Sequence, residues 1–163
     1  GLIALMGGEN VYSDQLQKVF DSGQFDMANE PDIGYPYLFN YVTDQEWRTQ
    51  KKVSELISTY FKNTPDGLPG NDDTGTMSAW LIYSMMGIYP ISPASPVYTL
   101  TAPVFDKITI QLDGSYYAQT QLVIEKEGKG TIKYIQLGDK THKSYHINHN
   151  DLIKGVNLKF ILE

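Results

Sequence analysis

Residues 67–75 read Gly-Leu-Pro-Gly-Asn-Asp-Asp-Thr-Gly, a stretch that places two adjacent carboxylates in a loop directly before a helical pattern. The glycines and the proline interrupt regular structure, while Asn, Asp and Thr are residue types that cap the exposed N–H groups of a following helix. Two interpretations are open on these residues alone. The stretch is either a capped turn, which is a routine helix start, or a catalytic loop that directs acids into a cleft.

A second segment of the same character lies earlier in the chain. Residues 28–41 read Ala-Asn-Glu-Pro-Asp-Ile-Gly-Tyr-Pro-Tyr-Leu-Phe-Asn-Tyr, so acids and an amide precede an aromatic-rich pattern. The Glu30-Pro31 pair is also consistent with an ordinary helix start, because proline is favoured in the first turn. This segment and the one at residues 67–75 are the two candidate functional loops of the sequence.

The first half of the chain is predicted to be helical. Leu16, Val19 and Phe20 recur at helical spacing and stop before Gly23, which indicates a short amphipathic helix. A second helix is predicted over residues 37–42. Asp44 is expected to cap a third, whose apolar face comprises Val53, Leu56, Ile57, Tyr60 and Phe61 and which ends before Pro65. A fourth is predicted from about residue 75 to residue 86, closed by Gly87.

The second half is predicted to consist of strands, because the apolar period changes from helical to alternating after residues 89–90. Alternation over residues 108–112 and again from residue 122, around the dipeptide Asp113-Gly114, predicts a β-hairpin with a tight turn. Further strands are predicted at residues 132–137 and 156–162. We therefore expect one antiparallel sheet of about five or six strands between Val97 and Leu162.

Composition excludes several classes of function. The chain has 163 residues, 41% of them hydrophobic, so it can bury one sizeable core or two small ones. Its net charge of -6 excludes nucleic acid as an expected partner, because phosphates require clustered Lys and Arg. There is no cysteine, and no apolar run is long enough for a membrane span. The chain begins at Gly1 with apolar residues that have no helix cap, which suggests a fragment of a longer protein.

The two loops, taken with other short motifs, resemble glycoside hydrolase family 92. The additional motifs are Met-Gly-Gly-Glu-Asn at residues 6–10, Met-Ser-Ala-Trp at 77–80 and Pro-Val-Phe-Asp-Lys at 103–107. The family comprises calcium-dependent, exo-acting α-mannosidases, found in secreted, periplasmic and cytoplasmic locations, so the resemblance leaves the compartment open. It implies an α+β chain, with residues 1–92 forming the last helices of an (α/α)6 catalytic barrel and residues 93–163 a C-terminal antiparallel β segment.

The resemblance also implies roles for the two aspartates. An inverting glycosidase uses two carboxyl groups about 6.5 to 9.5 Å apart, so the neighbours Asp72 and Asp73 supply only one half of the reaction. In the family the general base lies in the loop matching residues 71–73, and the general acid lies in a Glu-Gly-Asn-type motif that this chain lacks. Some relatives have Asp-Glu-Asp where this chain has Asn-Asp-Asp. Asn71 cannot accept a proton, so Asp73 is the predicted base and Asp72 the second candidate.

Asp73 has a second interpretation that does not exclude the first. It is also placed to cap the helix beginning near Gly75, and the helix dipole would then keep its carboxylate ionised.

Asn29 and Glu30 match the family segment that lines the terminal sugar subsite close to the calcium ion. Both are therefore predicted substrate-binding residues and calcium ligands, and oxygen atoms of amides and carboxylates suit calcium. Asp32 is a further subsite candidate. The predicted activity is inverting hydrolysis of terminal α-mannosides of glycans, of the α-1,2-mannosidase type. The isolated chain, without the acid and the remainder of the barrel, is predicted to be inactive.

Two other classes of function remain open on the sequence. The β segment can be a carbohydrate-binding module, for which Tyr116 and Tyr117 are the obvious exposed aromatic pair, or it can be purely structural. Trp80 can stack on a sugar, but a Trp one turn inside an apolar helix is predicted to belong to the core.

Overall fold

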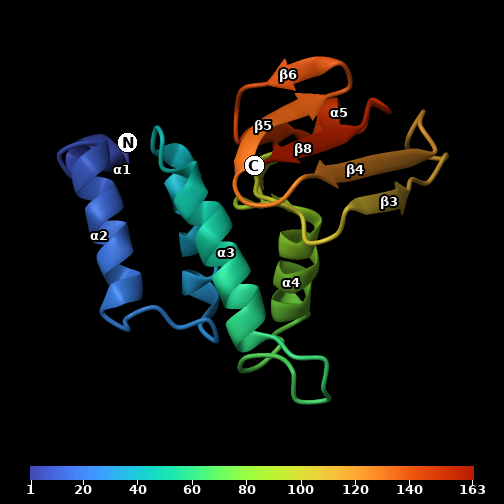
Figure 1. Cartoon of the computed structure of the whole chain (residues 1–163). Coiled ribbons are helices and arrows are strands. Elements are labelled where there is room, and N and C mark those ends of the chain that lie inside the picture. The colour runs from blue at the N-terminus through green and yellow to red at the C-terminus, as the bar shows by residue number, and fades with distance from the viewer. The chain divides into compact units, whose positions relative to one another are not determined.

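The computed structural model describes residues 1–163 as an α+β chain, with helices in the first half and strands in the second (Figure 1). The chain divides into two compact units, Gly1–Leu81 and Ile82–Glu163. This division lies inside a helix, whereas the predicted boundary at residue 92 followed the change from helical to alternating sequence. The assignment of residues 1–92 to a barrel and of 93–163 to a β segment stays a prediction.

The helical unit contains short and long helices in sequence order. They are α1 (Leu2–Leu5), α2 (Glu9–Asp21), the 3-10 helices η1 (Glu30–Asp32) and η2 (Tyr35–Tyr41), and α3 (Glu46–Tyr60). The last helix, α4 (Thr76–Met86), begins in this unit and crosses into the next. None of the helices is long and apolar enough to cross a membrane.

Helix α2 packs against η2 through a small apolar cluster. Tyr12 and Leu16 of α2 meet Phe39 and Val42 at the end of η2, and all four side chains are buried. The predicted helix at residues 37–42 therefore exists, but it is a 3-10 helix that begins at Tyr35. Short helices of this kind commonly serve as connectors, and Pro36 in its first turn fits that role.

Helix α3 confirms the third predicted helix but corrects its ends. It begins at Glu46 after Gln45, which makes no side-chain capping hydrogen bond, so the expected cap by Asp44 is wrong. Asp44 instead has a φ of 60°, a left-handed conformation that Asp tolerates in turns. Phe61 lies beyond the helix with extended backbone, although it was predicted to share the helix's apolar face.

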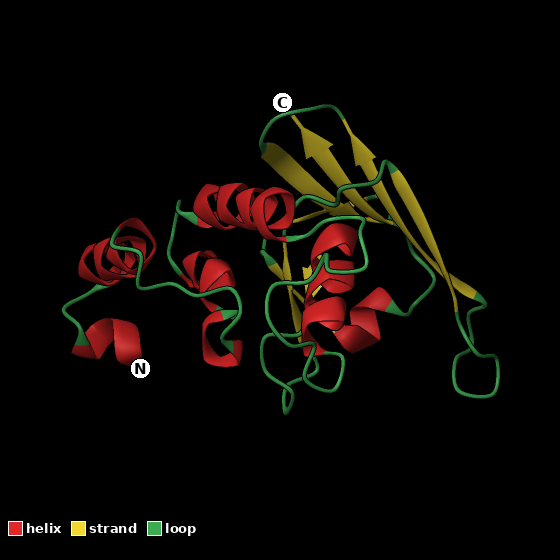
Figure 2. Ribbon diagram, turned by 90° about the horizontal axis from the view of Figure 1, so that it is seen from below, coloured by secondary structure: helices red, strands yellow, loops and turns green.

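The β unit contains eight strands in two sheets (Figure 2). The three-stranded sheet has the order β1-β2-β7, with strands Ile88–Tyr89, Val97–Leu100 and His146–Asn148. The five-stranded sheet has the order β3-β4-β8-β5-β6, with strands Lys107–Gln111, Gln121–Glu127, Leu158–Leu162, Ile132–Leu137 and Lys140–His142. A short helix, α5 (His149–Leu152), follows β7.

The prediction of one antiparallel sheet is therefore wrong in two respects. The strands form two sheets, and β8, the central strand of the larger one, runs parallel to its neighbour β4. Alternation of apolar residues shows which face of a strand is buried but not which strand lies beside it or in which direction. The predicted hairpin of β3 and β4 is confirmed, but its turn is a longer loop in which Asp113 accepts hydrogen bonds from Ser115.

The five-stranded sheet has one apolar and one largely polar face. Ile124 of β4 lies opposite Leu158 of β8, and Phe160 of β8 lies opposite Ile135 of β5; all four are buried. Alternate residues on the same strands, including Glu125 and Lys159, point to the other face. The buried side chains form the core of this unit together with Ile88, Leu100, Leu122, Ile147 and Leu152.

Candidate functional site

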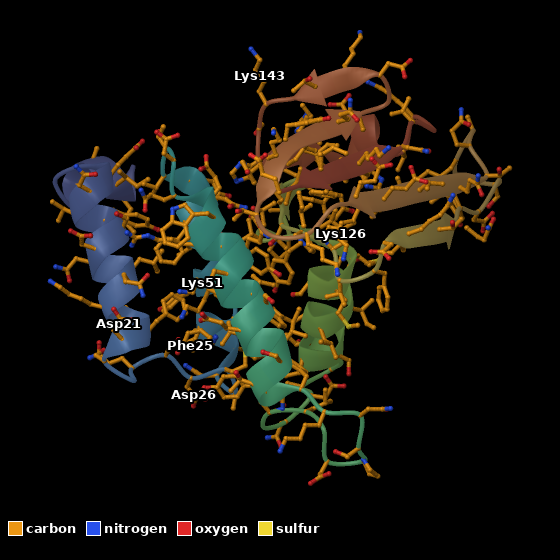
Figure 3. The ribbon with its side chains drawn as sticks, viewed as in Figure 1. Asp21, Phe25, Asp26, Lys51, Lys126 and Lys143 are labelled. Carbon is orange, nitrogen blue, oxygen red and sulfur yellow. The ribbon has the colours of Figure 1, made fainter.

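The first candidate loop is held in shape by a buried aspartate. Asp32 lies in η1, and its two carboxylate oxygens accept hydrogen bonds from the backbone N–H of Asp26 at 3.0 Å and from the side-chain amide of Asn29 at 3.3 Å. Figure 3 labels Asp26 where the chain leaves α2 and turns toward η1. The Asp32 carboxylate thus closes the loop around residues 26–32. Its predicted role in a sugar subsite stays a prediction.

Trp80 ties this loop to helix α4. Its indole N–H donates a 2.9 Å hydrogen bond to the backbone carbonyl of Ile33, and its ring stacks on Phe61 with centroids 5.5 Å apart and planes within 7°. Only 1% of the residue is exposed. The prediction that Trp80 belongs to the core is confirmed, and a sugar-stacking role is excluded by its burial. Its function is to fix the position of the first loop relative to the helix that follows the second.

The second candidate loop lies directly against the first. At Gly67 an added Cβ would come within 1.9 Å of the Lys62 carbonyl oxygen, so this tight turn requires glycine. At Gly70 an added Cβ would lie 2.8 Å from the Cβ of Ala28, and Gly70 has a φ of +66°. The backbone at residue 70 therefore contacts the residue that precedes Asn29. Two loops far apart in the sequence are adjacent in the structure.

This contact leads to a prediction about stability. Gly70→Ala places a methyl group against Ala28 and forces a left-handed conformation on a residue with a side chain, so it should destabilise the chain by roughly 1 to 3 kcal/mol. Urea unfolding followed by Trp fluorescence measures this loss. Gly75→Ala is the matched control, because Gly75 also has a positive φ but no atom within 4 Å of an added Cβ. Equal losses in the two variants would contradict the loop contact.

The structure distinguishes the two neighbouring aspartates of the second loop. Asp72 caps helix α4: its two oxygens accept hydrogen bonds from the backbone N–H and from the hydroxyl of Ser78, both at 2.8 Å. These bonds, the backbone one first, hold the pKa of the Asp72 carboxyl below its ordinary value. A carboxylate with both oxygens engaged and a lowered pKa is a poor proton acceptor.

Asp73 lies just before the N-terminus of α4, as predicted, but its carboxylate is not the cap. Its backbone carbonyl accepts hydrogen bonds from the N–H and the hydroxyl of Thr76, at 3.3 and 2.8 Å, while its exposed side chain makes no hydrogen bond or ion pair. The interpretation of Asp73 as a side-chain cap is therefore wrong, since the neighbouring Asp72 takes that role.

The backbone around Asp73 is strained. Asp73 and Thr74 have φ values of 34° and 62°, a left-handed conformation that costs about 1 to 3 kcal/mol at each residue with a side chain. Such strain persists where the surrounding structure imposes it, and it is concentrated at functional sites. The strained pair turns the chain between the Asp72 cap and the first turn of α4. The Asp73 carboxylate is consequently exposed at the surface of this loop.

The Asp72 cap gives a second prediction, which depends on pH. A folded-state pKa below the unfolded value means that the cap stabilises the fold above about pH 4 and that this contribution is lost as pH falls through the folded pKa. Asp72→Ala should lower the melting temperature by roughly 2 to 5 °C at pH 7. The difference from the unmodified chain should shrink as the pH falls through the lowered pKa of Asp72, because protonation removes the cap. Asp66→Ala, an exposed acid of the same loop, is the control, and a pH-independent difference would contradict the cap.

Asn29 and Glu30 supply oxygen atoms of the kind that calcium binds. The amide N–H of Asn29 is engaged by Asp32, which leaves the amide oxygen available, and the exposed Glu30 carboxylate forms no ion pair. The chain contains no group of three or more His, Cys, Asp or Glu side chains that could hold a metal ion. Calcium takes six to eight oxygen ligands, so these two residues fit only part of a coordination shell.

The contact between Gly70 and Ala28 places the second loop beside the residue that precedes Asn29. Close approach of Asn29, Glu30 and Asp73 to one another stays a prediction. The contacts of three residues that shape the site, Asp26, Gly70 and Ser78, were not predicted, although Gly70 was recognised from the sequence as a residue that interrupts regular structure. The signal for Gly70 was its place in a loop that carries paired acids, three residues after Gly67 and directly after Pro69. The Asp72–Ser78 cap spans six residues, which is longer than the usual capping pattern.

A model of the glycosyl hydrolase family 92 catalytic domain matches residues 1–163, the whole chain. The chain belongs to glycosyl hydrolase family 92. The resemblance seen in the loop motifs is thereby confirmed, and its α+β fold agrees with that of the solved family structures below.

Individual relatives of this family 92 chain agree with the family model. It is 29% identical over 164 residues to an uncharacterized secreted glycosidase of Arthroderma benhamiae, covering 99% of this chain and 21% of that protein. A family GH92 α-mannosidase from Bacteroides thetaiotaomicron is 26% identical with a TM-score of 0.85, covering 96% of this chain and 22% of that one.

A second solved structure, of a GH92 family glycosyl hydrolase, has a TM-score of 0.88 over 99% of this chain and 26% of the other; at 21% identity it shows the fold alone. The family 92 chain thus spans about a fifth of the length of the first two relatives.

Proposed function

We propose that a protein carrying this chain is a calcium-dependent, inverting exo-α-mannosidase of the α-1,2 type, in which this chain supplies the residue that activates water. The observation that carries the proposal is the division of labour between the two aspartates. The Asp72 carboxylate caps α4 through its two hydrogen bonds with Ser78. The Asp73 carboxylate has no partner and lies on a strained loop beside the Asn29 segment. Family membership and the likeness to a solved α-mannosidase support mannosides as the substrate class.

The reaction assigns one proton transfer to this chain. Asp73 accepts a proton from a water molecule as the water oxygen attacks the anomeric carbon from the face opposite the leaving group, which inverts the configuration there. The bond from the anomeric carbon to the leaving oxygen breaks, and that oxygen takes a proton from a second carboxyl group. In this proposal the second group lies outside residues 1–163, as the resemblance implies.

Asn29 and Glu30 bind the terminal sugar and contribute ligands to calcium. Bound calcium would coordinate sugar hydroxyl groups and fix the orientation of the ring. The Asn29 amide oxygen and the Glu30 carboxylate are the atoms that this chain offers, and the Asp32 carboxylate orients the Asn29 amide. The remaining ligands come from backbone carbonyls, water, substrate or other parts of the protein.

A third prediction follows from this division. The 163-residue chain should show no measurable hydrolysis of an aryl α-mannoside with calcium present, because it lacks the general acid and most of a barrel. The product of the complete reading frame should hydrolyse the same substrate. Release of the aryl group is measured for both proteins side by side. Robust hydrolysis by the 163-residue chain, lost on Asp73→Ala, would show that the chain holds its own acid.

The alternative of a non-catalytic module based on Tyr116 and Tyr117 loses its support. Tyr116 is 83% exposed, whereas the Tyr117 ring packs beside His149 with centroids 6.2 Å apart, so the two rings do not form one platform. The curated relative is described as secreted, which is one of the locations that family members have.

A further inference from the structure

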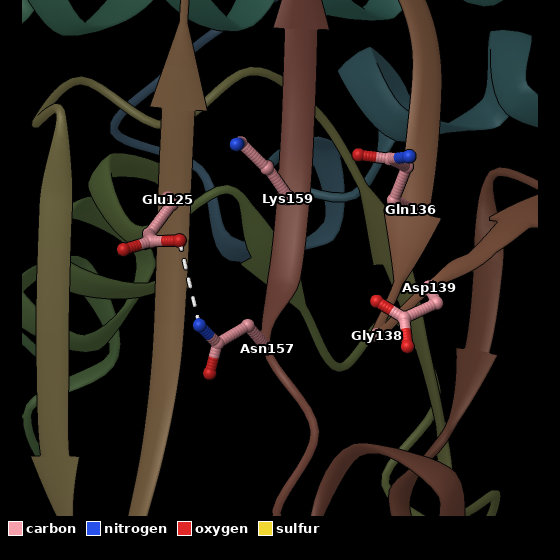
Figure 4. A pocket seen from close by; sticks show the side chains of 6 residues that line it. All are labelled: Glu125, Gln136, Gly138, Asp139, Asn157 and Lys159. Atoms are coloured by element: carbon pink, nitrogen blue, oxygen red, sulfur yellow. Dashed lines mark hydrogen bonds between the residues drawn. The ribbon is translucent and has the colours of Figure 1, made fainter.

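A groove of about 370 Å³ lies on the polar face of the five-stranded sheet, within the β unit (Figure 4). Three of its residues are direct neighbours across adjacent strands: Glu125 of β4 lies opposite Lys159 of β8, which lies opposite Gln136 of β5. Asn157 and the Gly138-Asp139 turn line the rest of the groove. The Gly138 N–H donates to the Asn157 carbonyl at 2.9 Å, so backbone contacts fix the turn.

The groove combines donors and acceptors whose hydrogen bonds are only partly satisfied. The Asn157 amide N–H donates to Glu125 at 3.4 Å, which leaves the Asn157 amide oxygen available. The side chains of Gln136 and Asp139 make no hydrogen bond within the chain. Figure 4 shows Asp139 and Gln136 on one side of the groove and Glu125 and Asn157 on the other. A ligand bound between these side chains can accept hydrogen bonds from amide N–H groups and donate hydrogen bonds to amide and carboxylate oxygens.

The charges of the groove indicate a neutral ligand. Glu125 forms an ion pair with Lys107 at 3.2 Å, and Lys159 forms one with Glu127 at 2.6 Å. The charges of Glu125 and Lys159, which line the groove, are therefore each neutralised by an opposite charge. Asp139 adds a single negative charge. The groove therefore has no cationic cluster for a phosphate or sulfate group, and no three-ligand cluster for a metal ion occurs in the chain.

An exposed aromatic residue outside the groove's lining lies on one of the strands that form the groove. Tyr134 precedes Gln136 by two residues on β5, so both side chains point to the polar side of the sheet, and 38% of Tyr134 is exposed. An aromatic ring beside amide and carboxylate groups is the combination that recognises a sugar, through its C–H surface and its hydroxyls respectively.

We propose that this groove is a second, non-catalytic site that binds a neutral saccharide. Gln136, Asp139 and Asn157 hydrogen-bond to hydroxyl groups, and Tyr134 packs against the ring of the sugar. The groove lies in the β unit, whereas the Asp73 loop lies in the helical unit. Binding at the groove therefore does not depend on the Asp73 loop.

The test is a titration of the chain with α-1,2-mannobiose and with a panel of neutral oligosaccharides, followed by saturation-transfer NMR. We expect a dissociation constant in the millimolar range, as for a shallow site with few contacts. Gln136→Ala and Tyr134→Ala should each weaken binding by about tenfold or more. Gln111→Ala is the matched control, because Gln111 lies on the same face but on the edge strand β3, outside the groove. Asp139→Asn, which keeps the turn residue small and polar, provides a second groove variant.

Each outcome decides the proposal. Loss of binding in the groove variants, with binding retained in Gln111→Ala and in Asp73→Asn, supports it, provided that the variants keep the near-ultraviolet circular dichroism of the parent chain. Binding that disappears only in Asp73→Asn or Glu30→Gln overturns it, because the sugar then occupies the loop site. No binding at millimolar saccharide overturns it as well. Binding at this groove in the 163-residue chain but not in the product of the complete reading frame also overturns it, because another part of the protein then covers the face.

Discussion

Asp73→Asn in the product of the complete reading frame is expected to lower kcat for an α-mannoside by about 10² to 10⁴, the usual contribution of a general base. The amide cannot accept the proton of the attacking water. Asn is the appropriate replacement because it tolerates the left-handed conformation that residue 73 adopts with a φ of 34°. The fold should therefore be unaffected, and the loss is measured as initial rates at saturating substrate.

The leaving group of the substrate distinguishes a base from an acid at residue 73. If Asp73 activates water, the loss should be similar for a glycan and for an aryl mannoside with a strongly acidic phenol. If it protonated the leaving oxygen, the acidic phenol would restore most of the rate, because such a leaving group needs no proton. Asp72→Asn serves as the neighbouring control and should act mainly on stability, since Asp72 is engaged by Ser78. A larger kinetic loss at residue 72 than at 73 would contradict the assignment.

Removal of calcium is expected to abolish the activity of the same protein. Treatment with a calcium chelator should reduce hydrolysis to background, and added Ca²⁺ should restore it. Mg²⁺ should not, because it demands shorter bonds of about 2.0 to 2.1 Å and a near-octahedral shell. Full activity in the presence of chelator would remove the calcium part of the proposal.

A substitution of Glu30 tests whether this chain supplies a calcium ligand. Glu30→Gln replaces a charged oxygen ligand by a neutral one, so it should raise the Ca²⁺ concentration needed for half-maximal activity by at least about tenfold. Glu55→Gln is the matched control on α3, where Glu55 pairs only with lysines of its own helix. An unchanged calcium requirement in Glu30→Gln would assign the ion to residues outside this loop.

The sequence predicted the helices well where apolar residues repeat over several turns. Val53 and Leu56 are buried in α3, as their spacing indicates, because the helical period fixes which side faces the core. The ends were less predictable. Asp44 has the chemistry of a cap, yet the helix begins two residues later, since capping residues and turn residues are largely the same types.

Sheet topology could be predicted only in part, for a related reason. The alternation at Leu158 and Phe160 correctly identified a buried face of β8, but its parallel pairing with β4 depends on contacts distant in sequence. The candidate site shows the same limit. Asp72 and Asp73 were recognised as a pair of acids, whereas only the structure shows that Ser78 engages Asp72 and leaves Asp73 free.

The measurement that tests the central claim most directly is a crystal structure of the product of the complete reading frame with a bound, uncleaved mannoside analogue. The claim is that the loops at residues 26–32 and 67–75 form one half of a glycosidase site with Asp73 as its base. The account predicts a water molecule about 2.6 to 3.2 Å from the Asp73 carboxylate and facing the anomeric carbon, with Asn29 and Glu30 at the terminal sugar. A sugar bound away from these loops, or an Asp73 carboxylate that contacts neither water nor sugar while Asp72 does, would contradict it.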